Sequence, residues 1–494
     1  MQFIKLTKGT DPIKVFNDLG FFKLSVGGGE VDLEPTPSLV YTLSSDGTYY
    51  IVGTGFTSIE AIEADTSGGT NGSGLDSTWT GGQLVIPSGH NGLPVKAIAP
   101  KAFNAVTNIT EMYIYDGITN IGHRAFQVSD PFDTTMKACR LPETLTSLGG
   151  TTSSGSGRVF WGRKGLEVLN IPDSVTYFPS STFAHIVLNN LTIKHGDVYN
   201  YAFQYADIKQ LIVGEEDDAN VYQFGQYAFY SSNIDYIKIN KNYVFSYTNP
   251  IVNTNIKKGV IYINLSNPYK NISGISPDIN YKESELDIIY EKEISGGIRG
   301  LCGFGKSNLR SIIVKNITSA TTSESGEGNA LNAFTGNYQK LDFGDLKYFA
   351  GYTYTRAGSI EGTADRVYFP SLERISDTLF SASAVIGKVF FGYSNCTLGS
   401  LNANILTKPC YFKPEYIDNY SKGTNWTSFF VNDGNEEPQM RVYREYASGD
   451  ALPTQIGTTQ VYNVTWYEDD DFTTPAGSTA TANKEYYGKI SAVV

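Results

Sequence analysis

The residue types that most often carry chemistry are few and scattered in this chain. The four histidines, His90, His123, His185 and His195, form no His-x-x-x-His or His-Glu-x-x-His pair, the spacing that places two ligands or a ligand and a base on one helix face. His185 and His195 are ten residues apart, so a shared site is one reading, and surface or turn histidines are the simpler one. We predict no catalytic residue, no metal site and no cofactor.

The cysteines and the acidic runs also favour structural roles. Cys139, Cys302, Cys396 and Cys410 lack the spacing of a disulfide framework or a C-x-x-C metal site, so we predict buried free thiols. The acidic runs at 215–218 and 469–471 lack the D-x-D-x-D-G spacing of a calcium loop, and we expect solvated loop tips. A carboxylate pair for glycoside hydrolysis can arise in any large β protein, so composition neither supports nor removes a glycan-active enzyme.

Composition predicts a turn-rich β protein. The 494 residues include 50 Gly, 34 Tyr and 27 Phe, which suit strands and turns better than long helices. The net charge of −12 argues against nucleic acid as a partner. No apolar stretch is long enough to insert into a membrane. The first twenty residues lack the apolar core of a signal peptide. This favours a protein that is not exported by the usual signal over a protein from which an export segment has been removed.

Short alternating strands recur along most of the chain. In the segment 168–178 two apolar residues, Leu169 and Ile171, flank the polar Asn170, and Pro172 then ends ladder pairing. One such unit cannot bury its own apolar face, but a stack can. Taking the second apolar residue of each strand as a marker, the rungs recur about every 25 residues, at Ile86, Ile114, Leu141, Ile171, Ile193, Val213, Ile239, Ile263, Ile289, Val314, Phe343, Phe369, Phe391 and Phe412.

A second marker, a small or apolar residue followed by Phe, repeats in phase with the first. It occurs at Phe103, Phe126, Phe183, Phe203, Phe229, Phe334 and Phe380. The small residue allows a turn to approach the next coil, and the Phe fills the layer beneath the strand. Between about 240 and 330 the strands continue without this pair, so rung boundaries are least defined there.

These units resemble the BspA-like leucine-rich repeat family. The segments GLPVKAIAPKAF, GITNIGHRAF, IPDSVTYFPSSTF and VYFPSLERISDTLF are similar to its "IP-x-SVT-x-IG-x-x-AF" pattern, and residues 410–429, with Tyr420 and Trp426, are similar to the unit that closes such arrays. The likeness covers residues 84–430. It implies a mainly β fold, a leucine-rich-repeat solenoid of short parallel strands, and the role of a bacterial cell-surface adhesin.

The remaining segments suggest terminal modules. We predict an N-terminal docking or linker segment at 1–40, a β-hairpin cap around Asp46-Gly47 with a Gly/Ser loop at 41–83, the solenoid at 84–430, and a small all-β C-terminal module at 431–494. In that module Tyr462, Val464 and Trp466 alternate onto one face of a strand.

The residue before each marker should point outward, and that row is the predicted binding surface. Its members are Tyr113, Arg140, Asn170, Thr192, Ile212, Lys238, Tyr262, Ile288, Ile313, Asp342, Tyr368, Phe390 and Tyr411. We select Asn170, Lys238, Tyr262, Tyr368, Phe390 and Tyr411 as binding residues. The last three form a ladder about 5 Å apart per rung, suited to sugar rings or a protein interface unless inserts or the C-terminal module cover it.

Three functions fit these features. The first is a non-catalytic binding or structural protein of a bacteriophage virion, in the tail or a fibre, which recognises a host-surface glycan or protein or neighbouring virion proteins, with a homo-oligomer as one form. The second is a bacterial cell-surface adhesin, which predicts an export signal. The third is a glycan-active enzyme. We favour the first, and we expect no enzymatic activity.

Overall fold

The computed structural model divides into two compact units, Met1–Ile212 and Val213–Val494, and each is described by itself. The division falls inside the predicted repeat region. The structure describes residues 16–17, 20–21, 25–26, 29–30, 33–65, 72–129, 132–150, 157–245, 251–264, 272–276, 278–299, 304–305, 307–321, 334, 336–349, 360, 362–375, 380, 383–394, 396–398, 409–421 and 440–492. Cys302, Trp426, most of the 1–40 segment and parts of the loops at 65–82, 149–157 and 318–329 lie outside these residues.

A β-hairpin lies against the first rungs. Strands β5 (Tyr41–Leu43) and β6 (Tyr50–Val52) pair antiparallel. In the turn between them the Asp46 carboxylate accepts hydrogen bonds from the Ser44 hydroxyl and the Thr48 amide, and Gly47 takes the positive φ that such a turn requires. Strand β6 then pairs in parallel with β9 (Leu93–Ile98), so the hairpin covers an edge that would otherwise be open.

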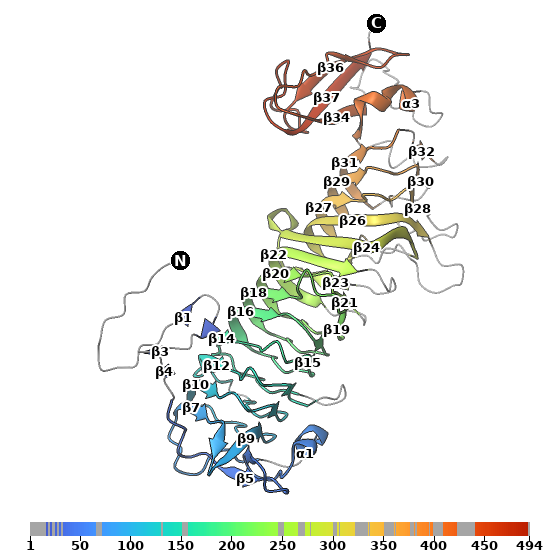
Figure 1. Ribbon diagram of the computed structural model, residues 1–494. Helices are drawn as coiled ribbons and strands as arrows, with labels where there is room; N and C mark the ends of the chain where they lie inside the picture. Colours follow the sequence, from blue (N-terminus) through green and yellow to red (C-terminus); the bar gives the residue numbers. More distant parts are fainter. Residues whose placement is uncertain are drawn as a thin grey trace. The chain divides into compact units, whose positions relative to one another are not determined.

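Unit 1 is a parallel β-solenoid (Figure 1). Its main sheet contains β7 (Gly82–Ile86), β10 (Ile109–Ile114), β12 (Ala138–Arg140), β14 (Val168–Leu169) and β16 (Val187–Ile193), and the markers Ile86 and Ile114 are Cα partners. A second sheet contains β11 (Asn120–Ile121) and β13 (Ser147–Leu148) next to β9, and β15 (Tyr177–Phe178) pairs with β17 (Asp197–Val198). The core lies between these sheets.

A column of stacked phenylalanines fills the core below the turns. The rings of Phe103, Phe126, Phe160, Phe183 and Phe203 follow one another with centroids 5.2, 5.6, 6.0 and 5.2 Å apart, and all five are buried. The second marker is thus confirmed here, but it omits Phe160. Val159-Phe160 has the form of the marker, but the segment 149–157 lengthens the spacing from Phe126 and hides it.

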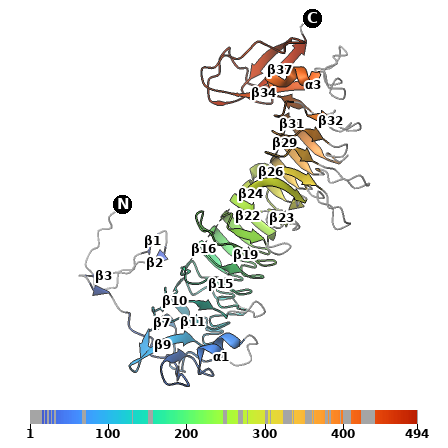
Figure 2. The same ribbon diagram turned by 45° about the vertical axis from the view of Figure 1, so that its right-hand side comes forward.

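Unit 2 contains a sheet of parallel strands (Figure 2). Its main sheet runs in the order β20 (Asn233–Ile239), β22 (Val252–Asn264), β24 (Glu285–Arg299), β26 (Asn308–Thr321), β27 (Asn337–Asp342), β29 (Thr363–Phe369), β31 (Val385–Phe391), β33 (Cys410–Phe412) and β34 (Met440–Tyr446). Of these strands, β22, β24 and β26 are the longest.

The markers lie in the core of unit 2, with one shift of register. Val213, Ile239, Val314, Phe343, Phe369, Phe391 and Phe412 are at most 1% exposed. The marker on β24 is predicted one residue too early. The Cα partner of the marker Ile263 is Tyr290, whereas Ile289 pairs with Tyr262 and Ile313. The predicted outward residue Ile288 is therefore wrong, since it is fully buried. Three consecutive apolar residues on β24 hide the alternation that would set the phase.

The C-terminal strands extend the sheet and then fold back. Strand β34 pairs in parallel with β33, and β37 (Lys484–Ala492) and β36 (Tyr462–Tyr467) add to it antiparallel. The face predicted for β36 is confirmed, because Tyr462, Val464 and Trp466 are all buried. This covered edge ends the stack.

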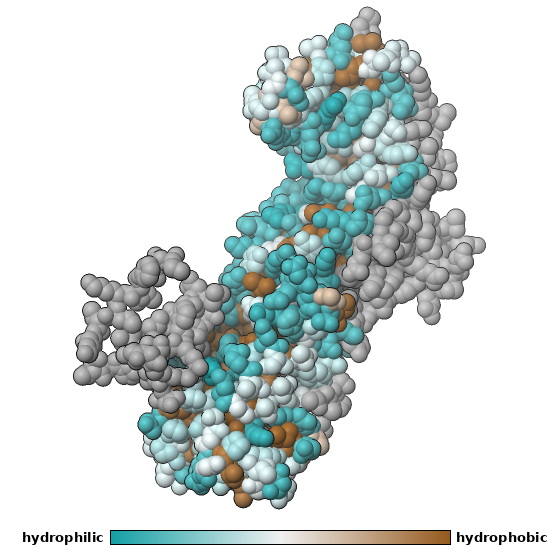
Figure 3. Space-filling view, viewed as in Figure 1, coloured by the Kyte–Doolittle hydropathy of each residue, from teal (hydrophilic) through white to brown (hydrophobic). Residues whose placement is uncertain are grey.

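The other elements are short. They are β1 (Phe16–Asn17), β2 (Gly20–Phe21), β3 (Ser25–Val26), β4 (Gly29–Glu30), α1 (Ile59–Ala64), β8 (Gly89–His90), β18 (Asp207–Val213), β19 (Tyr222–Phe224), β21 (Tyr243–Phe245), β23 (Ile272–Ile275), η1 (Tyr281–Glu283), β25 (Phe304–Gly305), β28 (Tyr348–Phe349), β30 (Arg374–Ile375), β32 (Thr397–Leu398), η2 (Pro414–Tyr416), α3 (Ile417–Ser421) and β35 (Gln455–Ile456). Among the described residues, no helix has the length and apolar character needed to cross a membrane. The face seen in Figure 3 is mostly hydrophilic, with hydrophobic residues in small patches.

Candidate functional site

The predicted aromatic ladder exists as a stack. Tyr368 on β29 is the Cα partner of Phe390 on β31, and Phe390 is the partner of Tyr411 on β33. The ring centroids are 4.4 Å apart in the first pair and 4.5 Å in the second, with nearly parallel planes. Such pairs each contribute about 0.5–1.5 kcal/mol beyond the burial of area. Parallel pairing in register thus positions the three rings as the rung spacing predicts.

The exposure predicted for this ladder is wrong for two of its three residues. Phe390 is fully buried and Tyr411 is 1% exposed, while Tyr368 is partly buried. Tyr443 and Tyr487, from β34 and β37, contact Phe390 edge-on, and Phe472 lies over Tyr411. The C-terminal strands cover these rings because burying large apolar surfaces is favourable. The ladder therefore joins the solenoid to its C-terminal module.

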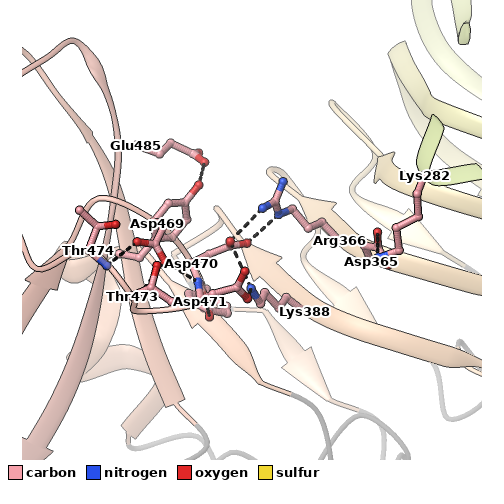
Figure 4. Close-up of polar contacts among 12 residues, drawn as sticks. Lys282, Asp365, Arg366, Lys388, Asp469, Asp470, Asp471, Thr473, Thr474 and Glu485 are labelled. Carbon is pink, nitrogen blue, oxygen red and sulfur yellow. Dashed lines mark hydrogen bonds and ion pairs between the residues drawn. The ribbon is translucent and has the colours of Figure 1, made fainter. Parts of the chain in front are cut away.

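Ion pairs beside the ladder hold a loop of that module in place. We call residues 468–475, between β36 and β37, the acidic loop. The Asp470 carboxylate accepts two hydrogen bonds from the Arg366 guanidinium, at 2.6 and 2.8 Å, and lies 3.1 Å from Nζ of Lys388 (Figure 4). Lys388 Nζ also contacts the Asp471 carboxylate at 2.5 Å. The side chain of Asp470 is only 3% exposed, so the expectation of a solvated loop tip is wrong for this residue.

The acidic loop is itself ordered by carboxylate capping. Asp469 accepts hydrogen bonds from the backbone amides of Asp471, Thr473 and Thr474, and these bonds lower its pKa to about 2. The Tyr411 hydroxyl donates to the Asp470 carbonyl at 3.0 Å. A folded turn thus presents its central carboxylate to the two cations of the sheet.

Opposing effects act on the two partners of the main ion pair. Burial of Asp470 disfavours its charged form, but the Arg366 hydrogen bonds and the charges of Arg366 and Lys388 outweigh it, so the pKa of Asp470 lies below its usual value. The hydrogen bonds to Asp470 raise the pKa of Arg366 against the effect of burial. Both groups are therefore charged at neutral pH, and their attraction is structural.

The other predicted binding residues do not form a common site. Asn170 is used internally, since its Oδ1 accepts from the Leu141 amide at 2.9 Å and its Nδ2 donates to the Leu141 carbonyl. These side-chain bonds take the place of backbone ladder bonds, because β14 has already ended. The marker Ile171, which follows Asn170, is half-buried rather than in the core. Lys238 pairs with Glu216 at 2.6 Å, and Tyr262 is half-buried on β22.

The three described cysteines and His123 are buried. Among the described residues, no group of three or more His, Cys, Asp or Glu side chains could hold a metal ion. Cys139, Cys396 and Cys410 are buried free thiols, as predicted, and burial raises their pKa values, which disfavours the reactive thiolate. His123 is a buried turn residue.

A second surface, on the turns of unit 1, was missed in the sequence. We call it the turn cluster, and its residues are Phe132, Arg158, Trp161, Lys164, His185 and Tyr205. The His185 ring stacks on Phe132 with centroids 4.7 Å apart and on Tyr205 at 4.8 Å. Trp161 meets both Phe132 and His185 edge-on. Tyr205 is 45% exposed, Lys164 is exposed, and the others are half-buried.

A buried ion pair positions the turn cluster. Arg163 donates to the Asp133 carboxylate at 2.5 Å and to the Phe126 carbonyl at 2.8 Å, and both charged side chains are at most 1% exposed. Each partner therefore fixes its neighbours, Phe132 on one side and Trp161 and Lys164 on the other. Gly162 takes a positive φ where a Cβ atom would lie 2.1 Å from the Val128 carbonyl oxygen, so the turn after Trp161 requires glycine.

A family model matches part of the solenoid. Residues 90–209 and 153–275 match the model described as "BspA type Leucine rich repeat region", in six copies. Residues 90–275 of the solenoid carry BspA-type leucine-rich repeats. No curated protein matches the chain. The BspA-type repeats matched by the model include every phenylalanine of the buried column from Phe103 to Phe203.

Three solved structures are similar to this chain at low sequence identity. A leucine-rich repeat protein of T. pallidum is 20% identical, with 37% of this chain and 86% of that chain covered and a TM-score of 0.23. One from Bacteroides ovatus is 12% identical, with 72% and 93% covered and a TM-score of 0.26. The pneumococcal vaccine antigen PcpA is 14% identical, with 79% and 96% covered and a TM-score of 0.29.

Proposed function

We propose that this protein is a non-catalytic binding protein of a bacteriophage particle, a tail or fibre component that attaches to a host surface or to neighbouring virion proteins through its solenoid. The observation that supports binding is the turn cluster, where aromatic rings and cations are held at the surface by a buried ion pair. Burying a charged pair in a core carries a large desolvation cost. Here it fixes side chains that face outward.

Several charged and thiol groups have structural roles, which favours a non-catalytic protein. Asp470 has its charge compensated by Arg366 and Lys388, Asp133 by Arg163, and the three described cysteines are buried. Catalytic groups need a pKa tuned to their task and access to a substrate. The roles that we assign to these groups are structural.

Composition and the covered C-terminal edge of the sheet support localisation in the virion. A particle protein exposed to the medium benefits from a surface without reactive thiols and from sheet edges that do not pair with other chains. The chain has four cysteines in 494 residues, and β36 and β37 cover the end of the stack. The BspA-type repeats favour a bacterial cell-surface adhesin as the second candidate.

One localisation experiment separates these candidates. Mass spectrometry of purified virions and of host envelope fractions should find this chain in the virions, at a stoichiometry typical of a tail or fibre protein. Light scattering of the purified protein would then give its oligomeric state. Finding the chain only in the envelope fraction, with a processed N-terminus, would replace the virion proposal with the adhesin.

A further inference from the structure

The rings of the turn cluster form a continuous surface across successive rungs. Phe132, His185 and Tyr205 stack in sequence, and Trp161 borders the first two. Most aromatic stacks in unit 1 lie in the core, where ring burial stabilises the fold. This one lies on the turns with Tyr205 at 45% exposure, so part of its apolar surface remains in contact with water.

Cations lie on this aromatic surface. Lys164 Nζ is 4.3 Å from the Phe132 ring centroid, and the Arg158 guanidinium is 5.4 Å from that of Trp161. Burial and the neighbouring charge of Arg124 both lower the pKa of Arg158. Within the described part of the chain, no carboxylate forms an ion pair with Arg124, Arg158 or Lys164, and the buried Nε atoms of both arginines have no hydrogen-bond partner.

Among the described residues, the absence of carboxylate partners for these three cations contrasts with the ion pairs on the strand surfaces. On the sheets a lysine or arginine commonly pairs with an acidic residue of a nearby rung, as in Lys137–Glu167, Arg140–Asp116, Lys194–Asp173, Lys238–Glu216, Lys257–Asp235 and Arg310–Asp287. The whole chain carries a net charge of −12. In an acidic protein, uncompensated cations at one place provide local complementarity to an anion.

Aromatic faces and unpaired cations together define the chemistry of the ligand. The apolar face of a sugar ring can pack on an aromatic side chain, and a carboxylate can accept charge-assisted hydrogen bonds from arginine or lysine. Single-stranded nucleic acid also combines stacking with charge. It is disfavoured because its dense phosphate charge requires a broadly basic surface, whereas this cluster has two cations and Arg124 beside it.

We propose that the turn cluster binds a carboxylated polysaccharide, with sugar rings against Phe132, His185 and Tyr205 and carboxylates against Arg158 and Lys164. This inference rests on the proposed binding function and specifies its ligand class. It does not require movement of the C-terminal module, because the whole cluster belongs to unit 1.

The test is calorimetric titration of the full chain with polygalacturonate oligomers at low salt. Three control probes separate the contributions. Dextran offers sugar rings without charge, and polyglutamate offers carboxylates without sugar. A 20-nucleotide oligo(dT) offers stacking bases with phosphates. We expect polygalacturonate to bind at least tenfold more tightly than each of the three, with affinity falling as salt rises. No binding of polygalacturonate, or equal binding of polyglutamate or oligo(dT), would overturn the proposal.

Matched variants assign the binding to this surface. Lys164→Glu should weaken polygalacturonate binding by about tenfold or more, as expected for reversing one charge at a contact, while Lys209→Glu, the same change at an exposed lysine of β18, should change it less than twofold. Tyr205→Ala should weaken binding by about fivefold or more, and Tyr236→Ala, the same change at a half-buried tyrosine of β20, should not. Equal losses in test and control variants, with unchanged circular dichroism, would contradict the assignment. Polysaccharide binding and virion localisation are separate measurements, so either proposal can fail alone.

Discussion

Removing the charge of Asp470 should loosen the C-terminal module. Asp470→Asn keeps the size of the side chain but replaces charge-assisted hydrogen bonds from Arg366 with neutral ones. Breaking a fully buried pair costs about 3–5 kcal/mol, and a hydrogen bond to a charged group contributes about 1.5–3 kcal/mol. The Arg366 side chain is 46% exposed, so water compensates part of the loss. We expect local stability to fall by about 2–3 kcal/mol.

Hydrogen exchange followed by mass spectrometry resolves this change by segment. A loss of 2–3 kcal/mol in local opening free energy accelerates exchange of the slow amides roughly 30- to 150-fold. We expect that acceleration in peptides covering β36 and β37, which pair with each other. Peptides covering β10 and β16 in unit 1 should exchange as in the parent protein.

Asp471→Asn is the matched control. The Asp471 side chain is 74% exposed and also contacts Lys388, and exposed ion pairs contribute about 0–1 kcal/mol. Its exchange should therefore accelerate less than about fivefold. If both variants behave alike, burial of the carboxylate is not what holds the acidic loop. If Asp470→Asn accelerates β10 and β16 equally, the effect is global and the local assignment is wrong.

Three further predictions concern pH, turns and rungs. Because the pKa of Asp470 is lowered from 3.8, its contribution to stability is present above that value and is lost as pH falls through the folded-state pKa; β37 exchange, corrected for intrinsic rates, should accelerate below about pH 3.8. Ala105 is exposed with φ +61°, so Ala105→Gly relieves about 1 kcal/mol of left-handed strain and should keep or raise the melting temperature, whereas the exposed control Ala447→Gly should lower it. Asn170→Ala should cost about 1–2 kcal/mol by removing both bonds to Leu141, seen as a lower denaturant midpoint.

The repeat architecture could be predicted because each rung contacts mainly its neighbours. In a solenoid, spacing along the sequence maps directly onto position in the stack, so markers such as Ile114 and Phe391 are found in the core as predicted. The same rule explains the stacking of Tyr368, Phe390 and Tyr411. Among the described residues, periodicity fails where alternation is lost, as on β24, where an insert lengthens a rung, and at Ile171, where β14 has already ended.

The burial of the predicted aromatic ladder could not be predicted from the periodicity of the sequence. Arg366 and Asp470 are 104 residues apart in sequence, and nothing in the spacing of the rungs indicates that the acidic loop returns to β29. A run of three aspartates has the same composition in a solvated tip and in a capped turn. The capped turn is distinguished by the hydrogen bonds that the Asp469 carboxylate accepts from the following backbone amides. The cover of Phe472 over Tyr411 follows from that return, whereas Tyr443 and Tyr487 cover Phe390.

The turn cluster, which we propose as a binding surface, lies at a different position of the repeat from the predicted row. Non-glycine residues with positive φ lie two positions before and two positions after the buried Phe of several turns, including Arg158 before Phe160 and His185 after Phe183. A left-handed residue is costly unless its setting imposes it, and here the amide-to-carbonyl bonds between successive turns impose it. Side chains at these two positions are not needed for the core, since the Phe column fills it. Sequence variation there can change the surface without changing the fold, which makes the turns, rather than the strands that end under the C-terminal module, the part of each rung best able to encode recognition.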